Sequence, residues 1–284
     1  TDSFTVSPLF FEGGDIGKLA IAGTVNDLAM MGAKPEYLSC SFIIEEGFPY
    51  ADLTRIVESM AAELAKSGAR IVCGDTKVVP KGAADKIFIN TSGVGTFPLP
   101  EQSRGISVRN LKAGDAILVS RDIGSHGACI LMARDALQLG SDLKSDCTTL
   151  WPQVEALLKA GITPHALRDA TRGGLAAVLN EWSSASGVAI ELEESAIPVC
   201  DPVRGLCELY GFEPHDLANE GTMVLALPAE QAQDALGILR QFNPAASQIG
   251  VVQASDRHKV ILNNPWGSRR YLELPQGELL PRIC

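Results

Sequence analysis

The sequence predicts a protein of two domains, an N-terminal α/β domain followed by a C-terminal α+β domain. Its 284 residues exceed the length of one typical hydrophobic core, so two packed units are expected. Helix-like and strand-like segments alternate in a similar rhythm in both halves. Between the halves, the proline- and glycine-containing segment at 98–110 interrupts this pattern and is the expected boundary. A composition of 46% hydrophobic and 20% charged residues is ordinary for a globular protein with a sizeable core.

In the N-terminal half, the pattern predicts helices joined to strands. The segment at 16–32 has helical length, and Gly32 is a plausible stop. A second helix is expected at 52–68. The expected strands are rich in β-branched residues, are bounded by glycine or proline, and lie at 37–46, 69–79 and 85–97.

The C-terminal half continues the alternation and contains no low-complexity tract and no convincing short repeat. Helices are expected at 126–138, 151–161, 174–186 and 229–242. Strands are expected at 116–120, 188–193, 222–228, 248–254 and 259–263.

Charge and cysteine usage narrow the class of protein. A formal net charge of -10 and a pI near 4.9 argue against a general nucleic-acid binder, which needs a basic face. No apolar run approaches the ~18 residues of a membrane span, and the start of the chain has no basic segment leading into an apolar core. The seven cysteines form no CxxC pair, and their odd number favours a reducing cytoplasm. Because the chain starts on Thr1 inside a strand-like run, we expect a preceding N-terminal segment to be missing.

The first helix carries an acidic residue in the middle of an apolar face. With 100° per residue, Asp27 falls at the centre of that face. An isolated ionised carboxylate there is costly, so Asp27 must meet a cation, a hydrogen-bond network or open space. Alternatively, the helix is apolar all round and Asp27 caps a neighbouring loop. The residues that share the face are Ile16, Leu19, Ala20, Gly23, Asp27, Met30 and Met31.

Three other aspartates lie at the ends of expected elements. Asp2 begins the first strand-like run, Asp75 follows a β-branched strand in CGDTK, and Asp169 lies between a strand end and a helix start in RDATRGG. Taken singly, each is more often a helix cap or a turn residue. Together with Asp27 they suit a hard, oxygen-seeking cation such as Mg²⁺, particularly one that carries phosphates.

A phosphate-binding segment is expected beside Asp169. Arg172, Gly173 and Gly174 directly precede a helix, where backbone N–H groups, the helix dipole and a guanidinium attract phosphate. Lys77 could act similarly. Neither a Walker A loop nor a GxGxxG fingerprint is present. The histidines lack metal-ligand spacing and are expected to be surface or capping residues, and the cysteines other than the last are expected to pack as small hydrophobes.

The chain ends on Cys284, after Pro275, Gly277 and Pro281. Proline and glycine disfavour a helix and leave an extended arm, which we expect to be movable. The position of the cysteine does not fit a prenylation box. Such an arm could carry a group on its thiol between active sites, although a frayed terminus is the simpler reading.

The assembled motifs closely resemble those of the HypE family of hydrogenase maturation factors, the carbamoyl dehydratases, within the superfamily of aminoimidazole ribonucleotide and selenophosphate synthetases. The likeness covers essentially the whole chain. It implies an N-terminal ATP-binding domain at 1–104 whose sheet pairs in a homodimer, a C-terminal domain at 105–273 that folds over the ATP cleft, and a flexible tail at 274–284. It is carried by the segment at 1–33, GDTKVV at 74–79, LRDATRGGL at 167–175, ANEG at 218–221 and PRIC at 281–284.

The resemblance also implies a reaction at the tail. In the family, the carbamoyltransferase HypF places a carboxamide on the terminal thiol, here Cys284. ATP then phosphorylates the carboxamide oxygen, and loss of phosphate and a proton leaves a thiocyanate. The cyanide passes to iron on a HypC-HypD scaffold complex and becomes a ligand of the [NiFe]-hydrogenase centre.

Site roles carried over from the family fall on the motifs already described. Asp2, Asp27, Asp75 and Asp169 match the positions that hold Mg²⁺ and the phosphates. Lys77 and Glu220 are the candidates for the dehydration step, Glu220 as the base and Lys77 as a charge partner for phosphate. Either could instead belong to a structural ion pair, and His215 is a weaker option.

One departure and two alternatives accompany this interpretation. The family has a glycine-rich segment before the first matched aspartate, and this sequence begins after it, so we expect weakened ATP binding. The runner-up is another ATP-dependent synthetase that activates a small-molecule amide or makes selenophosphate. A non-catalytic docking subunit whose tail inserts into a partner is the third reading.

Overall fold

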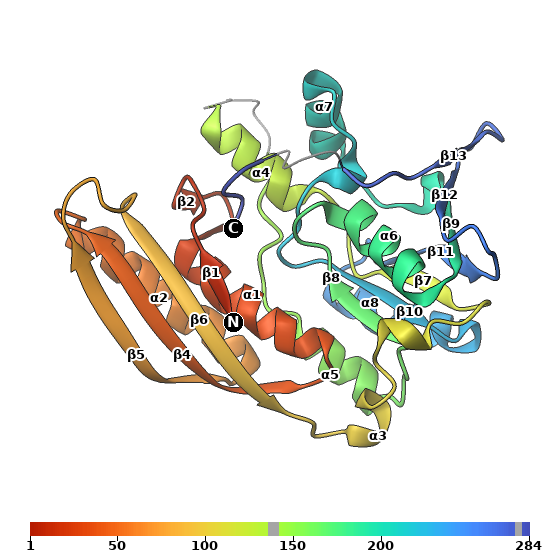
Figure 1. The fold of residues 1–284 in the computed structure, drawn as a ribbon, viewed down its shortest axis with the longest axis horizontal. Helices are drawn as coiled ribbons and strands as arrows, with labels where there is room; N and C mark the ends of the chain where they lie inside the picture. Colours follow the sequence, from red (N-terminus) through yellow and green to blue (C-terminus); the bar gives the residue numbers. More distant parts are fainter. Residues whose placement is uncertain (136–141, 276–279) are drawn as a thin grey trace.

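The structure is a computed structural model that describes residues 1–135, 142–275 and 280–284. Two sheets with their covering helices lie side by side, and both chain ends lie between them (Figure 1). Among the described residues, no helix has the length and apolar character needed to cross a membrane.

The N-terminal sheet has the strand order β1-β6-β4-β5. Strands β4 and β5 are parallel and are joined by a long connection through α2, as parallel neighbours require. Strand β6 is antiparallel to both of its neighbours, β1 and β4. A small hairpin of β2 and β3 precedes α1. The elements are β1 (Asp2–Phe4), β2 (Phe10–Phe11), β3 (Gly14–Asp15), α1 (Ile16–Met30), β4 (Lys34–Glu45), α2 (Tyr50–Ser67), β5 (Arg70–Val79) and β6 (Ile87–Thr96).

Helix α1 is buried on nearly every side, which explains its apolar sequence. It packs on the sheet, on α2 and on α5 (Trp151–Lys159) of the second domain. Its start is capped by Asp15, whose Oδ1 accepts the N–H groups of Gly17 at 2.8 Å and Lys18 at 3.0 Å. Asp27 does not cap a loop: its side chain is exposed at the open end of this otherwise buried helix.

Helices α1 and α2 cover one face of the N-terminal sheet, and the other face is open (Figure 1). Large side chains on that open face remain in contact with solvent, with Tyr37 42%, Ile43 44% and Val94 62% exposed. Cys73 of β5 is also exposed, so the prediction that it packs as a small hydrophobe is wrong. An edge strand and an apolar face left open in this way are typical of a surface that another chain covers.

The C-terminal sheet has the strand order β13-β12-β9-β11-β7-β10-β8, antiparallel except for the β12 and β9 pair. Helix α6 covers one face, and α5 and α8 lie on the side that meets the first domain. The strands are β7 (Ala116–Val119), β8 (Ala166–Asp169), β9 (Ala189–Glu193), β10 (Met223–Leu227), β11 (Ser247–Gln253), β12 (Val260–Asn263) and β13 (Arg269–Tyr271). The helices are α3 (Pro100–Ser103), α4 (Ser125–Arg134), α5 (Trp151–Lys159), α6 (Gly174–Ser186), α7 (Asp201–Tyr210) and α8 (Ala232–Phe242), with short 3-10 turns at 108–110, 194–196, 214–216 and 229–231.

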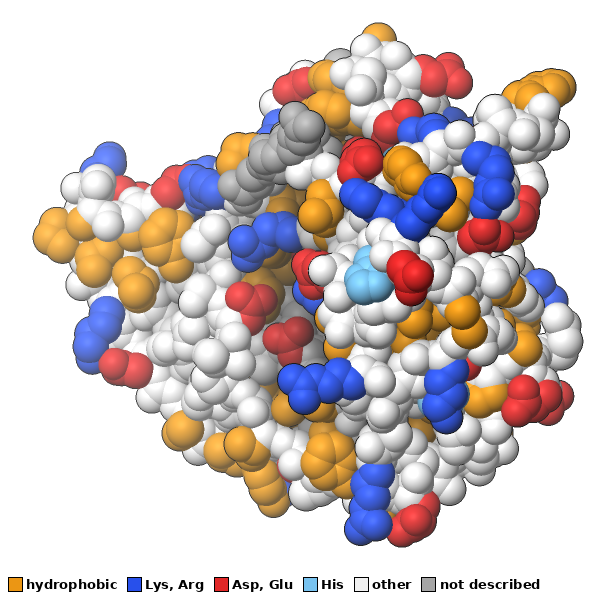
Figure 2. Space-filling model, turned by 45° about the vertical axis from the view of Figure 1, so that its right-hand side comes forward, with side chains coloured by type: hydrophobic (Ala, Val, Ile, Leu, Met, Phe, Trp, Pro, Cys, Tyr) orange, Lys and Arg blue, Asp and Glu red, His pale blue; other side chains and the backbone are white. Residues whose placement is uncertain are grey.

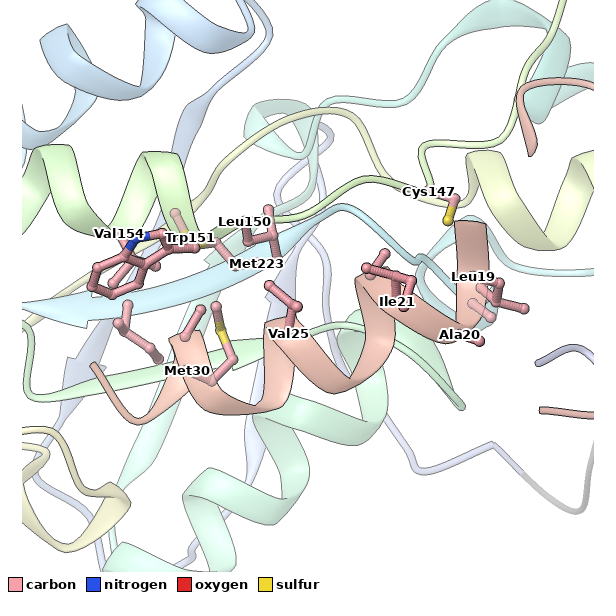
Figure 3. Close-up of a cluster of buried hydrophobic side chains, with 14 of the residues drawn as sticks. Leu19, Ala20, Ile21, Val25, Met30, Cys147, Leu150, Trp151, Val154 and Met223 are labelled. Atoms are coloured by element: carbon pink, nitrogen blue, oxygen red, sulfur yellow. The ribbon is translucent and has the colours of Figure 1, made fainter. Parts of the chain in front are cut away.

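The two domains share one hydrophobic core. Figure 3 shows side chains of α1, among them Ile21, Val25 and Met30, close to Leu150 and Trp151 of the second domain. Burying large apolar side chains across the boundary stabilises the arrangement, because each contributes about 1.5–3 kcal/mol when removed from water. The relative position of the sheets, and hence of any site between them, is therefore fixed by packing.

Candidate active site

Carboxylates from both domains meet in a cleft between the sheets. Asp2 begins β1, Asp27 lies near the end of α1, and Asp169 ends β8. Because α1 packs against both β1 and β8, these strand ends meet beside the helix. Glu220 joins them from the loop before β10, whose Met223 pairs with Asp169. Figure 2 shows acidic side chains in the shaded hollow between the two halves, with lysine and arginine side chains at its rim.

Burial and neighbouring carboxylates raise the pKa values of Asp27, Asp169 and Glu220 in the cleft. Burial raises the pKa of Asp169 to about 7, and the Asp27 carboxylate adds to the rise. Partial removal from water, followed by the Asp2 carboxylate, raises the pKa of Asp27. Burial holds the pKa of Glu220 well above its ordinary range, with Asp169 as the next cause. A bound cation would relieve this crowding, since positive charge favours the ionised carboxylates.

The loop that carries Glu220 is fixed by a second buried carboxylate. Asp146 accepts the N–H of Glu220 at 3.1 Å, the N–H of Gly221 at 2.9 Å and the Thr222 hydroxyl at 2.8 Å. The Glu220 side chain is 2% exposed, and its Oε1 has no hydrogen-bond partner among the described residues. A buried oxygen without a partner in a cleft points to a ligand at this position.

Cys284 lies with these groups rather than out in solvent. Burial raises the pKa of its thiol to about 11, the Glu220 carboxylate adds to the rise, and the Arg172 guanidinium opposes it. The main-chain oxygen of Cys284 accepts the N–H of Thr5 at 3.0 Å, just after β1. The end of the tail is thus docked in the cleft. Residues 276–279, which include Gly277 of the expected movable arm, lie outside the described residues.

Arg172 and Gly173 border a cavity of about 390 Å³ beside the tail, lined also by Ala218, Leu280 and Ile283. The two glycines have left-handed backbone, with φ of +72° at Gly173 and +58° at Gly174. A Cβ at Gly174 would lie 2.5 Å from the Leu217 main-chain oxygen, so close packing requires glycine there. The N–H of Gly174 donates to the main-chain oxygen of Thr171 at 2.9 Å. Of this segment, Arg172 and Gly173 therefore face the cavity, while Gly174 lets the helix start pack against the 215–217 backbone.

Asp75 and Lys77 lie away from the cleft. They are on β5, the strand at the opposite edge of the sheet from β1. Asp75 Oδ2 and Lys77 Nζ are 2.8 Å apart, both side chains are more than half exposed, and the hydrogen bond from Lys77 lowers the pKa of Asp75. Across the sheet, Asp75 is paired with Ser41, Ser41 with Asn90, and Asn90 with Ser3, the residue after Asp2. Strands β4 and β6 therefore lie between Asp75 and Asp2.

One chain therefore does not gather all the expected Mg²⁺ ligands. Within the described residues, no group of three or more histidine, cysteine or acidic side chains is arranged to hold a metal ion. The chemistry of the cleft still suits Mg²⁺, since Asp27 and Asp169 offer carboxylate oxygens whose pKa values are raised, and Oε1 of the nearby Glu220 has no partner among the described residues. Of the expected ligands, the fold brings Asp2, Asp27 and Asp169 to the cleft, and Asp75 is too far along the sheet to join them within one chain.

Comparison with known proteins assigns the family. The model of the AIR synthase related protein N-terminal domain matches residues 1–97, and that of the C-terminal domain matches 112–263. The chain is 48% identical to carbamoyl dehydratase HypE of Azotobacter vinelandii and 47% identical to that of Escherichia coli (strain K12), covering 100% of this chain and 83% of each relative. The chain belongs to the HypE family. The family's members are hydrogenase maturation proteins.

Solved HypE structures agree with this assignment. A crystal structure of HypE has a TM-score of 0.95 at 44% identity, covering 100% of this chain and 90% of that one, and a HypE complex with ATP has the same score and identity, covering 100% and 85%. A HypE-HypF complex has a TM-score of 0.91 at 46% identity, covering 96% and 89%. Thiamine monophosphate kinase of Aquifex aeolicus, at 18% identity and a TM-score of 0.69, covering 95% and 87%, shares the fold alone.

Several groups that build the site of this HypE-family chain were not predicted from the sequence. His126 is fully buried rather than a surface residue, and its ring bonds Ser145 and the main chain of Ile283. His215 is also buried, and burial lowers its pKa to about 4. Its ring faces Glu213 and Asp216 rather than Glu220. No local pattern marks His126 or Asp146, because Ile283 lies 157 positions from His126 and Glu220 lies 74 positions from Asp146 in the chain.

Proposed function

We propose that this chain performs the ATP-dependent dehydration of a carboxamide on Cys284 to a thiocyanate, the cyanide donor for the iron of a [NiFe]-hydrogenase. The observation that carries the proposal is the docked tail, which sets the Cys284 thiol beside Glu220 and Arg172 in an acidic cleft. A carrier cysteine and a buried carboxylate with an unpartnered oxygen are the two groups such a reaction requires.

The reaction balances with ATP as the only co-substrate. The carboxamide oxygen attacks the γ-phosphorus, releasing ADP, and loss of a first N–H proton gives an imidate phosphate on sulfur. Cleavage of the C–O bond then expels phosphate, and loss of the second N–H proton completes the C≡N bond. The oxygen leaves in the phosphate, so the sulfur-bound group has lost the elements of one water. The enzyme is in this sense a carbon-oxygen lyase.

Glu220 would receive the proton from nitrogen. Burial raises its pKa, so the ionised form of Glu220 is a stronger base than an exposed carboxylate. Bound Mg²⁺ would neutralise the phosphates. Asp2, Asp27 and Asp169 would hold the ion, and Arg172 with Gly173 would contact phosphate oxygens.

Lys77 and Asp75 take part through a second copy of the chain. We place the homodimer at the N-terminal sheet, where Tyr37, Ile43 and Val94 are exposed. A partner on this face would cover these side chains and carry its own Lys77 and Asp75 with it. Lys77 of one copy would then neutralise phosphate charge at the cleft of the other.

The proposed partners follow from the same chemistry. A solved HypE-HypF complex supports HypF as the carbamoyl donor. The thiocyanate would pass its cyanide to iron on the HypC-HypD complex. None of the seven cysteines, all within the described residues, forms a disulfide, which is consistent with a cytoplasmic reaction.

The test is mass spectrometry of the protein after carbamoylation by HypF, before and after Mg-ATP is added. Cleavage after Glu278 releases the hexapeptide 279–284, which contains Cys284 and no other cysteine. Loss of one water from this peptide supports the dehydration. If ATP is hydrolysed and the carbamoyl mass stays on Cys284, the dehydratase proposal is wrong; if Cys284 is never modified, the small-molecule synthetase becomes the better reading.

A matched variant separates chemistry from binding. Glu220→Gln keeps the size of the side chain and removes the base. We expect carbamoylation of Cys284 to continue and dehydration to slow by about 10²–10⁴-fold, the usual contribution of a general base. Dehydration at the normal rate in Glu220→Gln would remove Glu220 from this role.

A further inference from the structure

The docked tail is held by its main chain. The oxygens of its last four residues each accept a hydrogen bond from the body of the protein. Arg134 Nη2 donates to Pro281 at 2.6 Å and to Arg282 at 2.7 Å, and Thr5 N donates to Cys284 at 3.0 Å. Between them, His126 Nε2 lies 2.9 Å from the oxygen of Ile283. Because backbone oxygens are present in every sequence, these contacts hold the path of the chain whatever its side chains. One side chain of the tail adds to them: Arg282 donates from Nε to the Thr5 main-chain oxygen at 2.8 Å and pairs with Asp85 at 2.6 Å.

His126 makes the innermost of these contacts. A carbonyl oxygen can only accept, so Nε2 must carry the hydrogen. Its other nitrogen, Nδ1, lies 2.8 Å from Ser145 Oγ, which already accepts the N–H of Cys147 at 3.1 Å and so can give its own hydrogen to the ring. Ser145 thereby fixes the tautomer that donates to the tail.

Arg134 makes the outer contact from the other end of the same helix. Its Nε donates to the Ser7 main-chain oxygen at 2.7 Å while its Nη2 holds the tail. The fork of the guanidinium thus joins the segment after β1 to the last residues of the chain. Both ends of α4 therefore contact the tail, His126 near its start and Arg134 at its end.

The same helix is bonded to the loop that carries Glu220. Gly124 N donates to Asn219 Oδ1 at 2.7 Å, and Gly127 N donates to the Ala218 oxygen at 2.9 Å. On the other side, Ser145 precedes Asp146, which holds Glu220 itself. The residue that orients His126 and the residue that holds Glu220 are thus neighbours in one buried segment.

We propose that α4 is the docking element for the tail, and that His126, oriented by Ser145, is the positioning residue that sets Cys284 against Glu220. The docking is a property of the chain alone. Its effect on dehydration rests on the proposed function. Docking of the tail favours dehydration, which takes place in the cleft. It opposes carbamoylation by the donor, because that step requires the thiol outside the cleft.

The first experiment measures docking without any substrate. The protein is treated with iodoacetamide, and alkylation of Cys284 is followed on the hexapeptide 279–284. In His126→Leu, which loses the donor, we expect alkylation of Cys284 to be about tenfold faster, since one hydrogen bond is lost. His126→Gln keeps an N–H donor at a similar reach, so we expect its rate to stay near that of the unchanged protein.

Two cysteines serve as internal controls. Cys73 is exposed on β5, far from α4, and its alkylation should be equal in all variants. Cys147 is 1% exposed and should stay protected wherever the fold is intact. If His126→Leu exposes Cys147, the same alkylation test is made on the Arg134 contact. Arg134→Met is then the variant that loses the donor, and Arg134→Lys is the variant that keeps one. Equal Cys284 rates in a folded loss variant and the unchanged protein would overturn the proposal.

The second experiment separates positioning from general damage. We expect His126→Leu to be carbamoylated by HypF at least as fast as the unchanged protein and to dehydrate more slowly, with His126→Gln restoring the slower step. A merely structural defect would slow both steps, and that result would exclude the positioning role. If Cys284 is never carbamoylated at all, the proposed function fails, while the alkylation rates still decide the docking.

Discussion

The side chain of Asn26 holds Leu150 across the boundary between the two domains. Its Oδ1 accepts the N–H of Leu150 at 2.7 Å, and its Nδ2 donates to the Thr148 oxygen at 3.1 Å. The amide is 1% exposed, so its hydrogen bonds replace water that cannot reach these groups. Asn26 precedes Asp27 in α1, and this contact therefore fixes the helix end that carries a cleft carboxylate.

Asn26→Ala should destabilise the protein by about 1–3 kcal/mol, because the buried N–H of Leu150 loses its partner. Urea unfolding measures the change. Asn110→Ala is the control, since Asn110 makes an exposed bond to Gly105 at 2.8 Å. We expect the control to change stability by no more than about 0.5 kcal/mol. Equal stabilities for the two variants would show that the Asn26 contact is not a stabilising link between the domains.

Asp146→Asn should impair the reaction at Glu220 without removing a reacting group. The amide that replaces one carboxylate oxygen cannot accept from the loop, so the Glu220 loop loses at least one hydrogen bond. We expect slower dehydration, a stability loss of about 1–3 kcal/mol, and unchanged carbamoylation. Asp142→Asn, an exposed change in the same segment, is the control. Dehydration at the normal rate in Asp146→Asn would mean that Glu220 does not depend on this support.

Docking of the tail should weaken at alkaline pH. The docked Cys284 thiol has a pKa of about 11, above its ordinary 9.0, because burial disfavours the thiolate. Between these values the docked tail keeps its proton and the released tail loses it, so rising pH favours release. The pH profile of Cys284 alkylation should therefore rise toward about 11, whereas that of the free hexapeptide 279–284 should turn near 9.0. Coinciding profiles would mean that the thiol is not shielded in solution.

Mixed dimers should reveal whether the active site is shared between copies. Asp27→Asn disables the cleft of its own chain, and Lys77→Met disables the neighbour's cleft if Lys77 acts across the interface. A dimer of one variant of each kind would then keep one complete site, and mixing should restore dehydration that both parents lack. Lys81→Met, an exposed change after the same strand, should be fully active alone. No restoration on mixing would place Lys77 in its own chain or outside the reaction.

The sequence predicted the elements whose pattern is local. Helices α1 and α2 and the long strands of the first domain follow from periodicity and β-branched runs, and Gly32, with φ of +72°, follows the end of α1 as expected. The short element β13 was not predicted as a strand, and α7 was not predicted as a helix. A segment of three or four residues has too little pattern, and pairing with distant strands determines its structure.

The candidate site was predictable in its acidic groups and not in their support. Asp27 stood out because a carboxylate interrupts an apolar helix, and the structure places it at the open cleft. The separation of Asp75 from Asp2 depends on strand order, which the sequence does not reveal without the fold. His126, Ser145 and Asp146 act through contacts between distant segments, and neither spacing nor composition distinguishes them.

Because the body of the protein grips the tail through backbone oxygens, the sulfur of Cys284 takes no part in those contacts. The tail would therefore make the same main-chain hydrogen bonds to α4 whether Cys284 carries a free thiol, a carboxamide or a thiocyanate. The tail can therefore dock in the same position whichever group its sulfur carries. The order in which Cys284 reaches the carbamoyl donor, the cleft and the iron acceptor is then determined by the chemical group on the sulfur.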